Sequence, residues 1–106
     1  MRKNVIAAAA LLFATPAIAQ TASQSAAIAL ADVIAAEAAC GLSYDQTAIS
    51  RWIGDNVAAG DMEFTQTFNG YVTIDTYALG QMTASQKTAH CAQVTRVAQT
   101  YGFLRD

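Results

Sequence analysis

Ala38-Ala39-Cys40-Gly41-Leu42 and Thr88-Ala89-His90-Cys91-Ala92-Gln93-Val94 contain the only two cysteines of this 106-residue chain. Their wide spacing does not match the Cys-x-x-Cys pattern of a redox pair. With one histidine in the chain, they are also too few for a structural zinc site, which needs three or four such ligands. We therefore expect a structural disulfide between Cys40 and Cys91, joining the end of one helix to the middle of another.

The N-terminus has the three parts of a secretory signal peptide. Arg2 and Lys3 are followed by an apolar run from Val5 to Ala14 and by the small-residue site Ala17-Ile18-Ala19. The apolar run is about half the ~20 residues that a membrane-spanning helix needs. The pattern predicts that residues 1–19 are removed, that residues 20–106 form a single small domain, and that the protein is exported to the periplasm, where disulfides persist.

Charge argues against some classes of partner. Without residues 1–19 the chain keeps four basic and eight acidic residues, a net charge of −4, and no basic run. Nucleic acids and anionic membranes are bound through clusters of Lys and Arg. We therefore expect neither as a partner, and no membrane association after cleavage of the signal peptide.

The first part of the predicted domain is expected to contain a polar start and two helices. Gln20 to Gln24 is polar, and we expect it to be frayed. A helix is predicted from about Ser25 to Cys40, with a stripe that includes Ala31, Ala35 and Ala38, with Asp32 and Glu37 on the wetter face, and with Gly41 as its stop. A second helix is predicted to begin near Ser43, where Ser43-Tyr44-Asp45-Gln46 reads as a capping box, or near Asp45. It is predicted to stop at Gly60, with Trp52 as a core anchor.

The stretch from Asp61 to Met82 has two interpretations. Phe64, Phe68, Leu79 and other apolar residues fit one face of a helix with Asp61 as N-cap. Asn69-Gly70, however, lies between two alternating runs, which is typical of a β-hairpin. We favour the helix, because an isolated two-stranded hairpin is only marginally stable, and keep the α+β hairpin as the alternative.

The last helix is predicted from a capping box at Thr83-Ala84-Ser85-Gln86 to a stop at Gly102. Cys91 falls on its apolar face, and Phe103 and Leu104 can fold back onto its last turn. The sequence thus predicts an all-α fold, a small bundle of about four helices tied by one disulfide.

Residues with catalytic or metal-binding chemistry are sparse. His90 and Cys91 are neighbours on a helix and point about 100° apart, so we do not expect them to share a site. Met62 and Met82 could bind a copper ion with His90, but we interpret them as core methionines beside a solvated histidine. The cluster of Asp55, Asp61 and Glu63 is typical of a solvated helix boundary. We therefore predict no catalytic residue, no metal ligand and no cofactor.

The segment from Ala38 to Leu104 contains three motifs through which it resembles a known group of proteins. They are Ala39-Cys40-Gly41-Leu42, the run from Thr88 to Ala98, and Tyr101-Gly102-Phe103-Leu104. In these it resembles small exported two-cysteine proteins of Gram-negative bacteria, a family that implies a helical middle stretch and no activity or site residues. The architecture is also similar to that of the HdeA-type periplasmic acid-stress chaperones, on the cysteine spacing alone.

We expect a non-enzymatic binding or structural module whose partner is a protein or a small apolar ligand. The alternative is a periplasmic acid-stress chaperone, because protonating paired carboxylates lowers stability as pH falls. The sequence specifies neither the ligand nor the oligomeric state.

Overall fold

The computed structural model describes residues 21–104, which form four α-helices and no β-strand in that range. These are α2 (Ala22–Ala39), α3 (Gln46–Asn56), α4 (Met62–Gly80) and α5 (Ala84–Thr100). The all-α prediction is confirmed. The hairpin alternative is wrong, because Asn69 and Gly70 lie inside α4. The predicted signal peptide, residues 1–19, lies outside the described residues.

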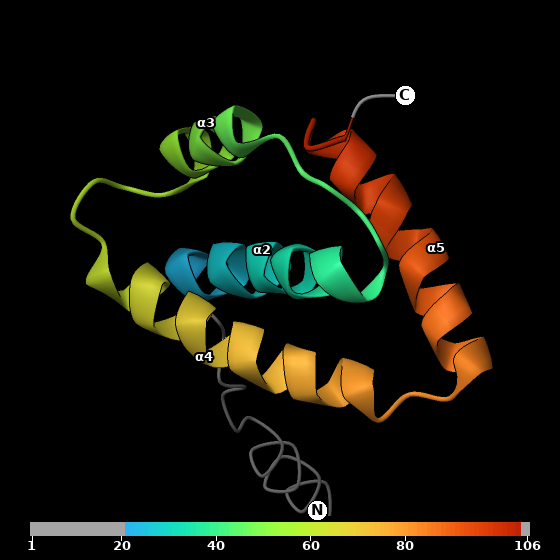
Figure 1. Ribbon diagram of the computed structural model, residues 1–106. Coiled ribbons are helices and arrows are strands. Elements are labelled where there is room, and N and C mark those ends of the chain that lie inside the picture. The colour runs from blue at the N-terminus through green and yellow to red at the C-terminus, as the bar shows by residue number, and fades with distance from the viewer. Residues whose placement is uncertain (1–20, 105–106) are drawn as a thin grey trace, which may run out of the picture.

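The helices are arranged around α2. Figure 1 shows α4 running alongside α2, α3 on the other side of α2, and α5 crossing near the C-terminal end of α2. The contact between α2 and α4 is the most extensive in the described part of the chain, and the contact between α2 and α5 is much less extensive. No helix among residues 21–104 is long and apolar enough to cross a membrane.

The start of α2 corrects the sequence prediction. Gln24 N donates to Thr21 Oγ1 over 3.1 Å, and Thr21 N donates to Gln24 Oε1 over 3.1 Å, so the two residues form a capping box. Residues 21–24 were expected to be frayed and α2 to begin near Ser25. The helix begins at Ala22 instead, because this reciprocal cap satisfies two backbone donors that would otherwise lack partners.

At α3 the structure selects the second of the two predicted starts, and the end of the helix differs from the prediction. Its N-cap is Asp45, whose Oδ1 accepts from Thr47 N over 2.9 Å and from Ala48 N over 3.3 Å; Ser43 is not the cap. The helix ends at Asn56, because Val57 takes an extended conformation. Gly60 therefore lies in the loop after α3, where its φ of 80° reverses the chain ahead of α4.

The caps of α4 and α5 are those expected from the sequence. Asp61 accepts from Phe64 N over 3.1 Å at the start of α4. Thr83 and Gln86 form the capping box that begins α5. Within α4, Thr73 donates to the Asn69 carbonyl oxygen four residues earlier, a bond that accommodates a β-branched residue in a helix.

Glycines end α2 and α5 in the same way. Gly41 has a φ of 67°, and Leu42 N donates to the Glu37 carbonyl oxygen over 2.8 Å. Gly102 has a φ of 84°, and Phe103 N donates to the Ala98 carbonyl oxygen over 2.9 Å. Both are the six-to-one bonds of a Schellman motif. As predicted, the second one folds Phe103 back into the core.

The main hydrophobic core lies around α2. It contains Ala27, Leu30, Val33, Tyr44, Ala48, Phe64, Ala98 and Phe103. Phe103 is 1% exposed, and burying such a side chain contributes about 2–3 kcal/mol. Its ring lies 5.7 Å from that of Tyr44, whose hydroxyl donates to the Val33 carbonyl oxygen over 2.8 Å. Trp52 is half-buried at the edge of this core, with its ring 5.4 Å from Tyr101.

Candidate functional site

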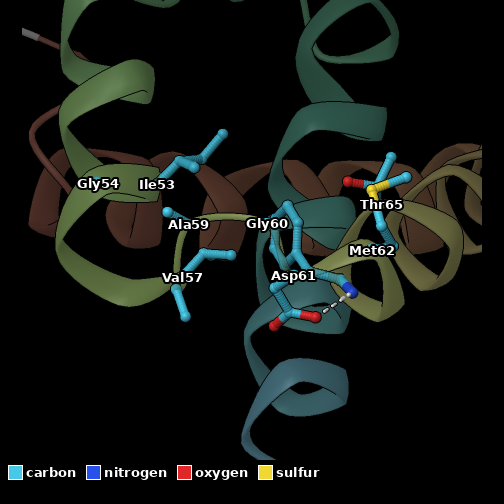
Figure 2. A pocket seen from close by; sticks show the side chains of 10 residues that line it. Ile53, Gly54, Val57, Ala59, Gly60, Asp61, Met62 and Thr65 are labelled. Carbon is cyan, nitrogen blue, oxygen red and sulfur yellow. Dashed lines mark hydrogen bonds between the residues drawn. The ribbon is translucent and has the colours of Figure 1, made fainter.

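The loop between α3 and α4 forms an apolar pocket of about 500 Å³. Figure 2 shows side chains from α3, the loop and α4 around it. We call it the α3–α4 pocket; its lining includes Ile53, Val57, Gly60, Met62, Phe64 and Thr65. Volumes of about 300–1,000 Å³ with mostly apolar walls are typical of small-molecule sites. The pocket therefore suits an apolar group of a ligand or partner.

Local structure explains why this pocket is open. Ala48 is the only fully buried residue of α3, so this helix rests on the core mainly through half-buried side chains such as Ile53. Met62 was expected in the core, but it is 64% exposed because it begins α4 at the edge of the pocket. Apolar surface at this edge is thus left accessible to solvent.

The lining of the α3–α4 pocket has few ionisable groups. The one ionisable side chain in its lining is Asp61. Its carboxylate accepts from Phe64 N and from the Ser23 hydroxyl of α2, and these bonds lower its pKa. The carboxylate is thus engaged in capping α4 and holding it to α2, and the remaining lining supports binding of apolar groups.

A second cavity brings together three ionisable side chains from three helices. We call it the acid cavity; it has a volume of about 130 Å³ and is lined by Asp32, Asp75, Ala78, Leu79, Met82 and His90. Asp32 and His90 also line an adjoining cavity of about 310 Å³, whose other walls include Val33, Val97 and Tyr101. His90 was expected to be solvated, but it is half-buried, and its Nε2 is buried without a hydrogen-bond partner in the described chain.

The two aspartates of the acid cavity interact directly. Burial of its carboxyl, a hydrogen bond with the Asp75 carboxyl and the charge of Asp75 raise the pKa of Asp32 to about 7. Solvent still reaches much of the Asp32 side chain, so the contact with Asp75 is the firmer of these causes. Asp75 Oδ2 is buried and accepts no hydrogen bond from residues 21–104. A proton on the Asp32 carboxyl would supply the missing hydrogen-bond donor.

Two of the three residues considered for a copper site come together, and the third does not. Met82 and His90 both line the acid cavity, whereas Met62 lies in the α3–α4 pocket. Within residues 21–104, no group of three or more His, Cys, Asp or Glu side chains is placed to hold a metal ion.

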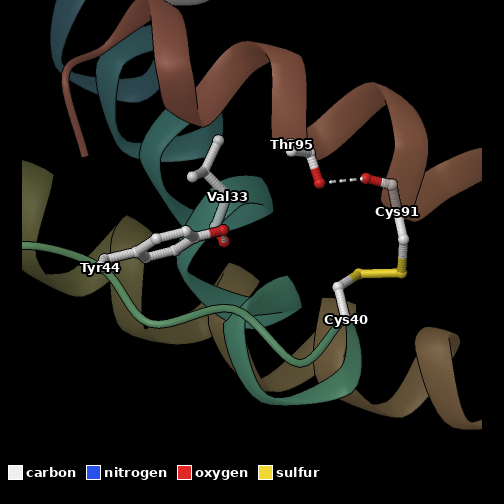
Figure 3. The surroundings of a disulfide bond; sticks show 5 residues. All are labelled: Val33, Cys40, Tyr44, Cys91 and Thr95. Atoms are coloured by element: carbon white, nitrogen blue, oxygen red, sulfur yellow. Dashed lines mark hydrogen bonds between the residues drawn. A yellow bond between two sulfur atoms is a disulfide. The ribbon is translucent and has the colours of Figure 1, made fainter. Parts of the chain in front are cut away.

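The disulfide predicted from the sequence is present. Cys40 follows α2, Cys91 lies in the middle of α5, and Figure 3 shows the bond between their sulfur atoms. The two Cα atoms are 5.5 Å apart. Both cysteines line a shallow cavity of about 550 Å³ with Lys87 and Thr95. His90 faces the acid cavity instead, so the two neighbours occupy different sites, as expected.

Sequence reasoning missed the pairing of Asp32 with Asp75. Asp32 is exposed, as expected for the wetter face of its helix. Its contact with Asp75 was not predicted, because the whole of α3 separates the two residues in the sequence. The available signal was an acid inside each of two mainly apolar helices, Asp32 in the middle of α2 and Asp75 in the C-terminal half of α4. Comparisons with protein-family models, with curated proteins and with solved structures found no match.

Proposed function

We propose that this protein is an exported, non-enzymatic helical binding module that takes an apolar group into the α3–α4 pocket. The observation that carries the proposal is this pocket of about 500 Å³, with apolar walls and an exposed methionine at its edge. The group would be a small apolar ligand or an apolar side chain of a partner protein. Export to the periplasm is supported by the signal-peptide pattern of residues 1–19 and is compatible with the disulfide.

Binding of a neutral fluorescent probe, N-phenyl-1-naphthylamine, tests this proposal. Ala59 lines the pocket and is exposed, so Ala59→Trp should fill the pocket at little cost in stability. We expect the variant to bind the probe at least about tenfold more weakly, which corresponds to about 1.4 kcal/mol. Ala89→Trp is the matched control, because Ala89 is exposed on α5 and outside these cavities. Equal affinities for the wild type and both variants would count against the pocket as the binding site.

One observation supports the alternative, a periplasmic acid-stress chaperone that opens at low pH. Asp61 accepts from Ser23 of α2, and its pKa is lowered in the folded protein. A lowered folded pKa gives stability that is present above the unfolded value and is lost as pH falls through the folded value. Strong acid would therefore release the start of α4 from α2 and expose apolar residues such as Phe64.

Circular dichroism and a client-aggregation assay at about pH 2–3, below the ordinary range of carboxyl pKa values, test this alternative. A chaperone of this kind should lose ordered structure there and suppress aggregation of a denatured client. Asp61→Asn should weaken the response to acid, since the amide does not titrate. A protein that stays folded and does not protect the client would exclude the alternative.

A further inference from the structure

The interface between α2 and α4 contains a pair of carboxyl groups that takes no part in the proposed binding at the α3–α4 pocket. Asp32 lies on α2 and Asp75 on α4, in the most extensive helix contact of the described chain. Their carboxyls are within hydrogen-bonding reach of each other, and both line the acid cavity. We infer that Asp32 and Asp75 form a proton-dependent latch, which holds α2 against α4 with one shared proton and loosens when both carboxyls are ionised.

The surroundings determine how strongly the pair responds to pH. In the lining of the acid cavity, α2 contributes Asp32, α4 contributes Asp75 and α5 contributes His90 as ionisable groups. The adjoining cavity adds the Tyr101 hydroxyl, and α3 contributes no residue to either lining. No Lys or Arg belongs to these two linings, so His90 is the one side chain in them that can carry a compensating positive charge.

The direction of the effect follows from the electrostatics. With the proton present, one carboxyl donates to the other, and the cavity has a single negative charge. Without it, two negative charges face each other in a partly buried site and repel. The folded protein therefore binds this proton more tightly than the unfolded chain, so the latch stabilises the fold fully below about pH 4 and loses its effect as pH rises to about 7.

The magnitude has an upper limit from linkage. One proton bound only by the folded state changes the unfolding equilibrium constant by at most about tenfold per pH unit. Solvent reaches Asp32 and screens the pair, so we expect about tenfold in total between pH 4.5 and 7.5. Most proteins gain stability over the acidic part of this range, so a loss would be distinctive.

Urea unfolding of the oxidised protein, followed by Trp52 fluorescence from about pH 4.5 to 7.5, tests the latch. We expect the wild type to become easier to unfold as pH rises, and Asp75→Asn to remove most of this trend, since the amide can donate to an ionised Asp32. Asp32→Asn should act in the same way and is the second variant if the first does not fold. Asp55→Asn, an exposed acid on α3, should keep the wild-type trend.

Two further measurements distinguish the latch from other causes. Carboxyl carbon NMR should give Asp32 a titration midpoint near 7 in the wild type and a clearly lower one in Asp75→Asn. His90→Gln should keep the pH trend of stability. A wild-type Asp32 midpoint below about 5, parallel stability profiles for wild type and Asp75→Asn, or loss of the trend only in His90→Gln would each overturn the inference.

Discussion

Removing the disulfide by Cys40→Ala/Cys91→Ala should destabilise this protein by about 4 kcal/mol. The bridge closes a loop with a sequence separation of 51 residues. In the chain-entropy model, the entropy lost by the unfolded chain on closing a loop of this length corresponds to about 4 kcal/mol at 25 °C. The total stability of a domain with about 84 ordered residues is about 4–12 kcal/mol at typical values per residue. The double variant should therefore be marginally stable.

The structure also predicts where the double variant loosens first. Helix α5 has only a small contact with α2, and residues 83–89 at its start are all exposed. Cys91 is the covalent link that holds this half of the helix against the end of α2. Hydrogen exchange should therefore rise first over residues 84–90, while α2 and α4 remain protected at the same denaturant concentration.

Urea unfolding with and without a thiol reductant measures the effect. Reductant should shift the wild-type midpoint down to that of the double variant and should leave the double variant unchanged. A loss below about 1 kcal/mol, with hydrogen exchange unchanged in α5, would show that noncovalent packing alone fixes this helix and would refute the reasoning.

Three smaller predictions follow from the core and the helix ends. Phe103→Ala should cost about 3–5 kcal/mol in urea unfolding, because it empties a fully buried site next to Tyr44. Tyr44→Phe should cost about 1 kcal/mol by the same measurement, since it removes the hydrogen bond to the Val33 carbonyl oxygen. Gly41→Ala should lower the melting temperature by an amount equivalent to about 1–2 kcal/mol, because Gly41 has a φ of 67°.

Local signals in the sequence were sufficient to predict the four helices and the disulfide. Asp61, the Thr83–Gln86 capping box and the terminal glycines Gly41 and Gly102 act through bonds within a few residues, so their roles could be predicted without knowing the fold. The same kind of signal at Thr21 and Gln24 was present but overlooked. At the start of α3, the sequence offers two possible N-caps two residues apart, Ser43 and Asp45. The local pattern alone did not show that Asp45 is the N-cap.

The buried faces and the cavities depend on contacts between distant segments. Alanine occurs all around α2, so hydrophobic periodicity could not distinguish buried Ala36 from exposed Ala38. The α3–α4 pocket exists because Val57 turns the chain away from α3 before Gly60, which changes where Met62 lies. Neither feature has a signature in short-range spacing.

Two sites in the α2–α4 interface should respond to pH in opposite directions. At one end, Asp61 accepts from Ser23 and has a lowered pKa, so this contact weakens only as pH falls below the ordinary carboxyl range. Farther along both helices, the pair of Asp32 and Asp75 is strongest in acid and weakens as pH rises through about 7. The interface should therefore be most stable near pH 4, between the two transitions.

Melting temperatures from about pH 2 to 8 check this expectation, and variants distinguish the contributions of the two sites. Asp61→Asn should flatten the profile below about pH 4 and leave the neutral side unchanged. Asp75→Asn should flatten the neutral side and leave the acid side unchanged. Because Asp61 precedes α4 and Asp75 lies several turns farther along it, their effects should add, and the double variant should show a nearly flat profile. A maximum that stays near pH 7 in the wild type would contradict the assignment of opposite signs.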